Sequence, residues 1–314
     1  MKSKEHSIYT LIESNKHAVK NNQLNFTDDQ IFQKGLDELI KTAAKDAISL
    51  KFYFGNCMKA LKEARANQLG AASALIERAQ KYAQLDKLDE KELKIYQLIR
   101  YPIEAYIAYK HNDYEKSFNY TMETILIDET FEKEFPVMFF HRIQQLHNLS
   151  RIFVRQSKYE EACEIVNLLL KCLVGNISTS YSKCSFDVIY CIPELKKLRK
   201  LMAYQVFYET VGLFNKLENT EKEEYLFNIC FNGYENWKDP AETGITYWAN
   251  AKDAYYKKND ENQFVTSVSA FLKNSNDYFS DEPLLNLTKY IIEFFHKKNT
   301  ELSSKIEQLI LEHA

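Results

Sequence analysis

The stretch AYIAYKHNDYEKSF, residues 105–118, decides the fold, because a looser version of it returns about 45 residues later as LSRIFVRQSKYEEA, residues 149–162. Each copy consists of an apolar helix end, a polar turn, an aromatic residue, two charged residues and the start of a new apolar helix. Chains that repeat a helix–turn–helix unit stack each copy on its neighbour. The repetition therefore predicts an all-α protein, built as an α-solenoid of antiparallel helix pairs.

Length and composition agree with stacked helices. The chain has 314 residues, which exceeds one compact core of ordinary size but suits an array in which each unit packs on the next. It contains 7 glycines and 5 prolines, where average usage predicts roughly 20 and 15. Phosphate-binding loops, tight hairpins and barrel corners all need glycine, so this shortage argues against Rossmann folds, TIM barrels and β-sandwiches.

The charge balance argues against a nucleic-acid partner. A formal net charge of −3 and a pI near 6.2 give no overall positive field. The basic run KKLRK at 196–200 lies beside Tyr204, Phe207 and Tyr208, and such a run can meet a phosphate backbone. It is more consistent with an exposed helix face ahead of an apolar one. The aromatic content of 14% is interpreted as coding bias, because Lys, Asn, Ile, Tyr and Phe are all abundant.

The cysteines and the N-terminal residues bear on the compartment. The 6 cysteines form no Cys-x-x-Cys pair, and their spacing fits neither a zinc site nor a redox motif, so most are expected to be buried small hydrophobes. The first residues, MKSKEHSIYT, contain no apolar core of signal-peptide length. No apolar run is long enough to span a membrane. These features predict a cytoplasmic protein with no membrane partner, no cofactor and no metal.

A single helical-repeat domain is expected over residues 1–314. Its expected parts are N-terminal helices over 1–50, helix pairs over 51–174, an irregular loop or insertion over 175–193, and further helix pairs over 194–314. The third part, GNISTSYSKCSFDVIYCIP, is rich in Ser and Thr, begins at Gly175 and ends at Pro193. A connection that long is unusual within a compact domain, so it can have a role of its own. No convincing strand is found in the sequence.

Start signals and apolar periodicity place the helices. A helix is expected over 8–20, and the capping box TDDQ at 27–30 opens another that runs towards the 40s, with its continuation through Leu50 left open. Asp239 followed by Pro240 marks a further start. The remaining helices are expected over 50–66, 70–85, 90–110, 114–128, 137–156, 159–174, 194–217, 222–234, 239–258 and 263–274, with two more beginning near 280 and near 300.

The two copies resemble the tetratricopeptide repeat. That family's unit places an apolar residue, a Leu, a small residue and an aromatic in its first helix, a polar turn, and small and aromatic residues in its second helix. The second copy matches at Leu146, Leu149, Ser150, Phe153, Lys158, Tyr159, Ala162 and Val166. The first copy matches at Tyr101, Ala105, Asp113, Tyr114 and Ser117, but departs at Glu104 and Ala108, where the family prefers Leu and Tyr.

The resemblance covers about half of the chain, and its motifs are degenerate. A third unit is suggested by Trp248, Tyr255 and Asn259-Asp260, with a poorly matched second helix. A fourth, over 53–82, matches only in its second helix. The 45-residue spacing exceeds the family's usual 34, which implies longer helices or looser turns.

In arrays of this family the first helix of each unit lines a concave groove, so the resemblance implies a set of candidate binding residues. In the second unit His147, Arg151 and Arg155 step by four, and a row of guanidinium groups is suited to carboxylates or phosphates. The candidate residues of all three units together imply a mixed aromatic and basic groove for an acidic or C-terminal peptide segment. The candidates of the first two units are Tyr106, Tyr109, Lys110, Gln144, His147, Arg151, Val154 and Arg155, and those of the third are Asp253, Tyr256 and Lys257.

No motif in the sequence indicates catalysis. Glu293 and His296 have the Glu-x-x-His spacing of a di-iron ligand pair, but the other histidines lack a Glu three residues before them, and a di-iron bundle needs two such motifs. Neither a His-Glu-x-x-His, a Gly-x-Ser-x-Gly nor a Walker motif occurs. A site assembled from residues far apart in the sequence stays open.

The sequence therefore predicts a non-catalytic scaffold or adaptor that binds a protein or a peptide. Two alternatives stay open. One is a peptide-responsive regulator, in which a ligand in the groove changes the curvature of the array. The other is a helical enzyme whose catalytic residues come together only in the fold.

Overall fold

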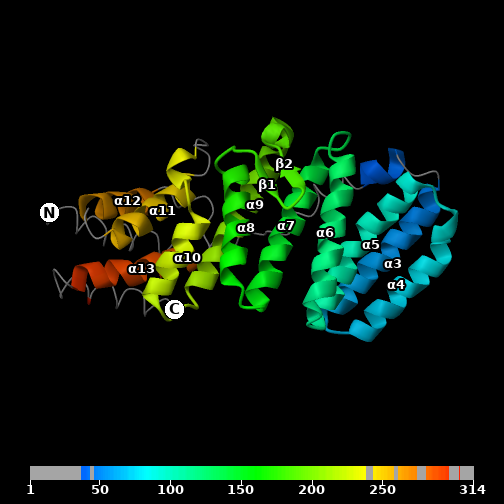
Figure 1. Cartoon of the computed structure of the whole chain (residues 1–314), viewed down its shortest axis with the longest axis horizontal. Helices are drawn as coiled ribbons and strands as arrows, with labels where there is room; N and C mark the ends of the chain where they lie inside the picture. The colour runs from blue at the N-terminus through cyan, green and yellow to red at the C-terminus, as the bar shows by residue number, and fades with distance from the viewer. Residues whose placement is uncertain are drawn as a thin grey trace. The chain divides into compact units, whose positions relative to one another are not determined.

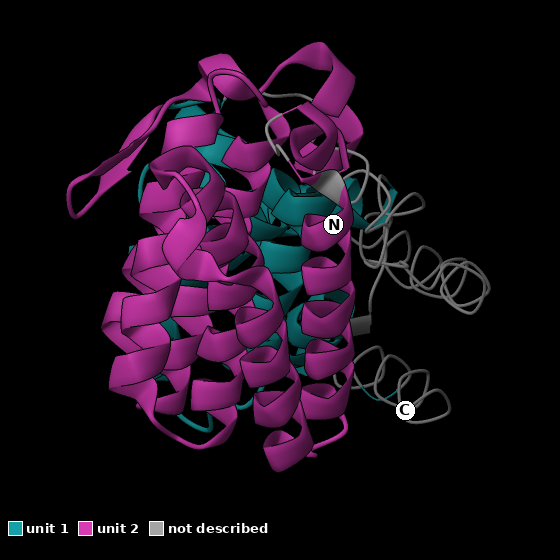
Figure 2. Cartoon of the chain, turned by 90° about the vertical axis from the view of Figure 1, so that its right-hand side faces the viewer, with its two compact units in different colours: residues 1–27, 170–177, 200–314 teal, residues 28–169, 178–199 magenta. Residues whose placement is uncertain are grey.

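The computed structural model describes residues 37–42, 46–237, 243–257, 261–273, 281–296 and 304, and these residues are mostly helical with little strand (Figure 1). The chain divides into two compact units, coloured separately in Figure 2. Unit 2 comprises 28–169 and 178–199, and unit 1 comprises 1–27, 170–177 and 200–314. Of the helix predicted after the capping box at 27–30, residues 37–42 are described; they are helical, and Leu39 and Ile40 are buried as expected. The helix predicted over 8–20, all of the helix predicted near 300 except residue 304, and the start signal at Asp239 lie outside the described residues.

The predicted helices from residue 50 to residue 174 are confirmed, and each observed end lies within three residues of the predicted one. Helix α5 begins at a capping box in which Glu92 N donates to Asp89 Oδ1 (2.9 Å) and Asp89 N donates to Glu92 Oε2 (3.4 Å). The helices are α3 (Ala47–Arg65), α4 (Leu69–Ala83), α5 (Glu90–Lys110), α6 (Tyr114–Phe131), α7 (Val137–Arg155) and α8 (Tyr159–Leu173).

A continuation of the preceding helix through Leu50 is wrong. Helix α3 starts afresh at Ala47, because Asp46 leaves the helical conformation and its carboxylate caps the new helix by accepting from Ile48 N (3.1 Å) and Ser49 N (3.0 Å).

The same turn joins α3 to α4, α5 to α6 and α7 to α8. Its central residue is left-handed in every case, Asn67 (φ 63°), Asn112 (φ 61°) and Ser157 (φ 60°), and successive ones are 45 residues apart. The residue after it donates its amide hydrogen to a carbonyl five residues back, as in a Schellman helix end. These bonds are Gln68 N to Glu63 O (2.8 Å), Asp113 N to Ala108 O (2.9 Å) and Lys158 N to Phe153 O (2.9 Å). The spacing predicted from two copies therefore extends to a third turn.

Within unit 2 the helices pack mainly on their neighbours in the chain. Helix α3 packs on α4 and α5, and α6 packs between α5 and α7. Tyr53 of α3 meets Tyr96 of α5 edge-on at 4.7 Å, and Ser117 Oγ of α6 donates to Ala105 O of α5 (2.9 Å). This packing fixes α3, α5 and α7 relative to each other.

The 175–193 segment is not wholly irregular, and the expectation of no strand is wrong. Strands β1 (Thr179–Tyr181) and β2 (Cys184–Phe186) form an antiparallel hairpin in which Tyr181 faces Cys184. Cys184 and Phe186 are buried and Ser185 is exposed, an alternation typical of a half-buried strand. Three-residue strands are too short for this pattern to stand out in the sequence. The segment also holds the 3₁₀ turn η2 (Val188–Tyr190), and η3 (Pro193–Leu195) follows at its end.

A buried arginine anchors this hairpin. Arg142 of α7 is 0% exposed, and its guanidinium donates to Glu132 Oε2 (2.6 Å), Glu129 Oε1 (3.1 Å) and Ser185 O (2.6 Å). The same group lies 4.5 Å from the ring centroid of Phe186. One side chain therefore holds α6, α7 and β2 together.

Unit 1 contains an aromatic core around Trp248. The rings of Phe207, Phe214, Phe227 and Phe231 lie 5.2–6.4 Å from the Trp248 ring. The elements of this part of the chain are α9 (Lys196–Phe214, whose first residues belong to unit 2), α10 (Thr220–Cys230), η4 (Tyr234–Asn236), α11 (Thr243–Tyr256), α12 (Glu261–Lys273) and α13 (Asp281–His296). Helix α10 ends four residues before its predicted end, because Gly233 adopts a φ of 82° in the turn that follows.

A fully buried ion pair lies beside this core. Lys252 Nζ donates to Glu223 Oε1 (2.6 Å), both side chains are 0% exposed, and the ammonium lies 3.3 Å from the ring centroid of Tyr290. Burial lowers the pKa of Lys252 to about 7, although Glu223 opposes this shift.

Two composition-based expectations can be compared with the described residues. Five of the six cysteines are buried, as predicted, and Cys191 is half-buried. None of the helices in the described part of the chain combines the length and the apolar character needed to cross a membrane.

The left-handed turn generates a stability prediction. We expect Ser157→Val to lower the free energy of unfolding by about 1–2 kcal/mol, because a β-branched residue is strained at this φ. Ser157→Gly is the matched control and should leave stability unchanged or slightly higher. Urea denaturation followed by circular dichroism measures both, and equal midpoints for the two variants would contradict the turn geometry.

The buried Arg142 side chain, which anchors the hairpin, generates a second stability prediction. Arg142→Met leaves Glu132 buried without its partner, so the free energy of unfolding should fall by about 3–5 kcal/mol. Combining it with Glu132→Leu should recover part of this loss. Arg78→Met, at an exposed position of α4, is the control and should change stability by less than about 0.5 kcal/mol. A comparably small effect of Arg142→Met would show that the anchor is not stabilising.

Candidate functional site

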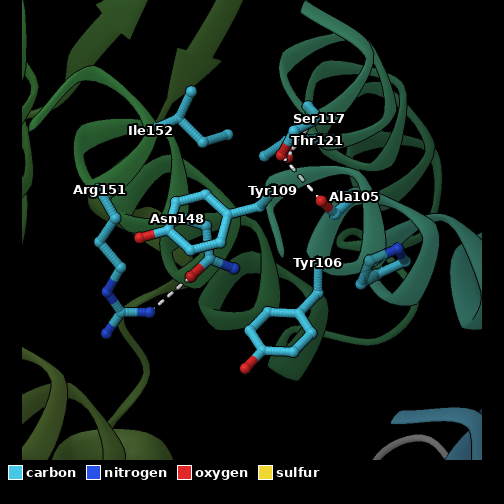
Figure 3. Close-up of a pocket in the computed structure, with 9 residues that line it drawn as sticks. Ala105, Tyr106, Tyr109, Ser117, Thr121, Asn148, Arg151 and Ile152 are labelled. Atoms are coloured by element: carbon cyan, nitrogen blue, oxygen red, sulfur yellow. Dashed lines mark hydrogen bonds between the residues drawn. The ribbon is translucent and has the colours of Figure 1, made fainter. Parts of the chain in front are cut away.

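Two adjoining depressions lie in unit 2. The larger has a volume of about 360 Å³ and is lined from α3, α5 and α7; the smaller has a volume of about 240 Å³ and is lined from α5, α6 and α7. Both are lined by Pro102 and Tyr106 of α5 and by Asn148 and Arg151 of α7. We call the two depressions together the α5–α7 groove. Figure 3 shows the smaller one, with Tyr106, Tyr109, Asn148 and Arg151 among its labelled lining residues.

The groove combines an apolar wall with a polar one. Its apolar lining comes mostly from α3 and α5, and its polar lining comes mostly from α7. Arg65 and Arg151 supply positive charge, and neither Asp nor Glu is among the described residues that line it. The apolar residues of the larger depression are Phe54, Met58, Leu61, Leu98, Pro102, Ile103 and Met138, and the polar residues on α7 besides Arg151 are His141, Gln144, Gln145 and Asn148.

A chain of hydrogen bonds runs along the α7 wall. Arg151 Nη1 donates to Asn148 Oδ1 (2.6 Å), as Figure 3 shows, and Asn148 Nδ2 donates to Gln145 Oε1 (3.2 Å). Gln145 Nε2 lies 3.1 Å from His141 Nε2, and His141 Nδ1 lies 2.9 Å from both carboxylate oxygens of Asp128. We call these five side chains the α7 ladder. It joins a groove arginine to a carboxylate inside the protein.

Asp128 and His141 form the inner end of the ladder. Asp128 of α6 is 0% exposed, whereas the His141 side chain is 21% exposed and lines the larger depression. Burial by itself lowers the pKa of His141, but the charge of Asp128 and its hydrogen bond outweigh burial and raise this pKa above 6.5. Burial also raises the pKa of Asp128, against the effect of His141. The imidazole is thus oriented by a carboxylate that favours its protonated form.

The structure brings together some of the residues predicted from the sequence. Tyr106 and Arg151 line both depressions, Tyr109 lines the smaller one and Gln144 lines the larger one. Arg155 is exposed at the end of α7, where its Nε donates to the hydroxyl of Tyr109 (2.8 Å) and its guanidinium lies 5.8 Å from the Tyr109 ring centroid.

Other predicted residues lie elsewhere. Lys110 and Val154 are half-exposed and are not among the described lining residues, and His147 is buried, with 4% of its surface exposed. The expected row of His147, Arg151 and Arg155 is not brought together in the groove, because His147 is buried, Arg151 lines both depressions and Arg155 is exposed at the end of α7. The observed stripe mixes steps of three and four.

The residues of the predicted third unit belong to unit 1. Tyr256 is buried with its hydroxyl 3.4 Å from that of Tyr290, and Lys257 Nζ donates to Asp253 Oδ2 within α11 (2.7 Å). They are not among the described residues that line the groove, all of which belong to unit 2.

Sequence reasoning missed Asp128, His141, Gln145 and Asn148. The signal that could have found the α7 members is their spacing, because 141, 145, 148 and 151 are polar positions three or four residues apart on one helix. The sequence could not have predicted the role of Asp128, because only the packing of α6 against α7 places it beside His141.

The groove offers hydrogen-bond donors rather than a nucleophile. A histidine held by a carboxylate can act as a general base, but the described lining of the larger depression contains no Ser, Thr, Cys or Lys for it to activate. In the smaller depression Ser117 Oγ donates to Ala105 O (2.9 Å) and Thr121 Oγ1 to Ser117 O (2.8 Å), so both hydroxyls bond the helix backbone. Among the described residues, no cluster of three His, Cys, Asp or Glu side chains could hold a metal ion.

Comparison of the chain with protein-family models, with curated proteins and with solved structures gave no match. The resemblance to the tetratricopeptide repeat therefore stays a prediction.

The Asp128–His141 pair generates a titration prediction. We expect the pKa of His141 to lie above 6.5 in the natural chain and below 6.5 in Asp128→Asn, because burial then acts without the opposing charge. NMR titration of the histidine ring protons in the natural chain and in Asp128→Asn measures this. A His141 pKa that stays the same in Asp128→Asn would rule out the charge coupling.

Proposed function

We propose that this protein is a non-catalytic scaffold or adaptor, and that its α5–α7 groove binds a segment of another protein or a peptide. The observation that carries the proposal is the origin of the groove lining. Its walls come mainly from α3, α5 and α7, which are the first helices of three pairs joined by the same turn. This is where an array of tetratricopeptide-like units would carry its concave face. We accordingly propose that the helix pairs stack as an α-solenoid of that kind.

The lining favours a peptide over a compact small molecule. The two depressions are contiguous along α5 and α7 and present apolar side chains beside amides, so an extended segment could place successive side chains in both. Amide groups such as those of Gln144 and Asn148 can pair with a peptide backbone, whereas the apolar wall can take side chains.

The charges favour an acidic segment. Arg65 and Arg151 line the groove, Arg155 stands at its outer end beside Tyr109, and its described lining has no carboxylate. A guanidinium pairs with a carboxylate through two parallel hydrogen bonds, which gives both affinity and orientation.

A peptide array tests this proposal. One half carries short random-sequence peptides rich in Asp and Glu, and the other half carries the same peptides with Asn and Gln at those positions. We expect the fluorescently labelled protein to bind members of the acidic half only. Binding to neither half would overturn the proposed function.

Reversing a groove charge gives the matching mutational prediction. Arg151→Glu should weaken binding of the array-selected acidic peptide at least about a hundredfold, because like charges then face each other, and adding Arg155→Glu should abolish it. Arg78→Glu makes the same charge change at an exposed position of α4 and should leave the affinity unchanged. Fluorescence anisotropy measures the affinities, and thermal melts confirm that the variants fold. Equal affinities of Arg151→Glu and Arg78→Glu would remove the groove from the proposal.

A further inference from the structure

The smaller depression of the α5–α7 groove owes its space to small side chains. These are Ala105 of α5 and Ser117 and Thr121 of α6, and all three are buried. Ser117 Oγ donates to Ala105 O (2.9 Å) and Thr121 Oγ1 donates to Ser117 O (2.8 Å), so both hydroxyl hydrogens are already bonded within the fold. An apolar group can therefore lie on this floor without leaving a buried donor unpaired.

Aromatic rings form much of the wall of this depression. Tyr106 and Tyr109 lie one turn apart on α5, and their rings are nearly parallel, with centroids 6.4 Å apart and an angle of 22° between the ring planes. Figure 3 shows both rings with their faces turned the same way. Pro102 and Ile152 add apolar surface to the same lining. Such a wall favours another aromatic ring, because ring pairs gain more than the burial of their area alone.

Tyr109 is held in place within the fold. Its hydroxyl accepts from Arg155 Nε (2.8 Å), and its ring meets that of Tyr114 edge-on at a centroid distance of 6.2 Å. Tyr114 is fixed in turn, because its hydroxyl donates to Oδ1 of Asn112, the left-handed residue of the repeated turn (2.8 Å). A ligand side chain that packs on Tyr109 then orders little of the protein, which lowers the entropic cost of binding.

The larger depression has a more adaptable lining. Its apolar side chains include Met58 and Met138, and methionine fits partners of different shapes because it is unbranched and flexible. Tyr106 is the one tyrosine among its described lining residues, whereas the smaller depression has two. Selection for one kind of ligand side chain is therefore expected in the smaller depression.

We propose that the smaller depression anchors one aromatic side chain of the ligand, next to the acidic residue that the groove recognises. This inference rests on the proposed function, and it adds the class of residue that decides specificity. The two ligand residues are neighbours because Arg151 lines both depressions, so a carboxylate bound there lies beside the anchored ring. The ligand segment thus combines an aromatic residue with an adjacent Asp or Glu, and its side chains in the larger depression can be of any apolar type.

Substituted peptides test the anchor without changing the protein. Each aromatic residue of the array-selected acidic peptide is replaced in turn by Leu and by Ala, and fluorescence anisotropy measures the affinities. At the anchoring position we expect Leu to weaken binding about fivefold, through the lost ring contacts. Ala should weaken it at least about thirtyfold, through the lost burial as well. Exchanging Leu, Ile and Met at the other apolar positions should change affinity less than about threefold.

Filling the depression gives the matching test on the protein. Thr121→Met places a longer side chain there and should weaken binding of the aromatic peptide at least about thirtyfold. It should leave the affinity of the Ala-substituted peptide unchanged, because that peptide has no large side chain to place in this depression. Thr121→Ser keeps the hydroxyl and its bond to the backbone, and should bind both peptides as the natural chain does. Thermal melts confirm that both variants fold.

NMR adds a direct measurement on the natural chain. With labelled methyl groups, we expect nuclear Overhauser effects from the ring protons of the bound peptide to the methyl groups of Thr121 and Ile152. Acidic peptides that bind equally well with Ala in place of every aromatic residue, and that show no such contacts, would overturn the anchor and leave the peptide-binding function standing. Failure of every acidic peptide to bind would overturn both.

Discussion

Two buried carboxylates near the end of α6, Asp128 and Glu132, must be matched by consecutive side chains of α7. An ionised carboxylate is costly to bury without a partner, and His141 and Arg142 supply those partners at 2.9 and 2.6 Å. The two ion pairs connect α6 and α7 to different parts of unit 2. Arg142 extends to the hairpin through Ser185, and His141 extends to the groove through the α7 ladder. A single packing requirement between α6 and α7 thus positions the insertion and orients the polar wall of the groove.

The repeated turn does similar work for the apolar wall. Asn67, Asn112 and Ser157 reverse the chain in the same way at intervals of 45 residues, and each of these turns follows the first helix of its pair. Helix α6 packs between α5 and α7, and the groove between these two first helices is floored in its smaller part by Ser117 and Thr121 of α6. Both hydroxyls are used in helix-to-backbone bonds, which leaves the groove without a reactive group at this point. This setting agrees with the binding role that we propose for the groove.

The two units solve the problem of buried charge differently. In unit 2, one member of each buried ion pair also contacts the groove or the hairpin: His141 lines the larger depression, and Arg142 donates to Ser185 O. Unit 1 seals Lys252 and Glu223 among Trp248, Tyr256 and Tyr290, with no exposed surface on either partner. A sealed pair can specify packing but cannot meet a ligand, whereas His141 lines a depression of unit 2.

The sequence by itself determined the helices, because apolar periodicity, caps and turn residues act over a few positions: α5 runs over the predicted 90–110, and the copies around Asp113 and Lys158 are joined by the same turn. The resemblance to the tetratricopeptide repeat also implied Tyr106, Tyr109, Gln144 and Arg151 as binding residues, and these four line the two depressions. Only the tertiary structure decided that His147 is buried, that the hairpin pairs, and that Asp128 meets His141. Each of these depends on which helix packs against which and at what rotation. That choice is made by the summed burial of many side chains, and no local stretch of sequence encodes it.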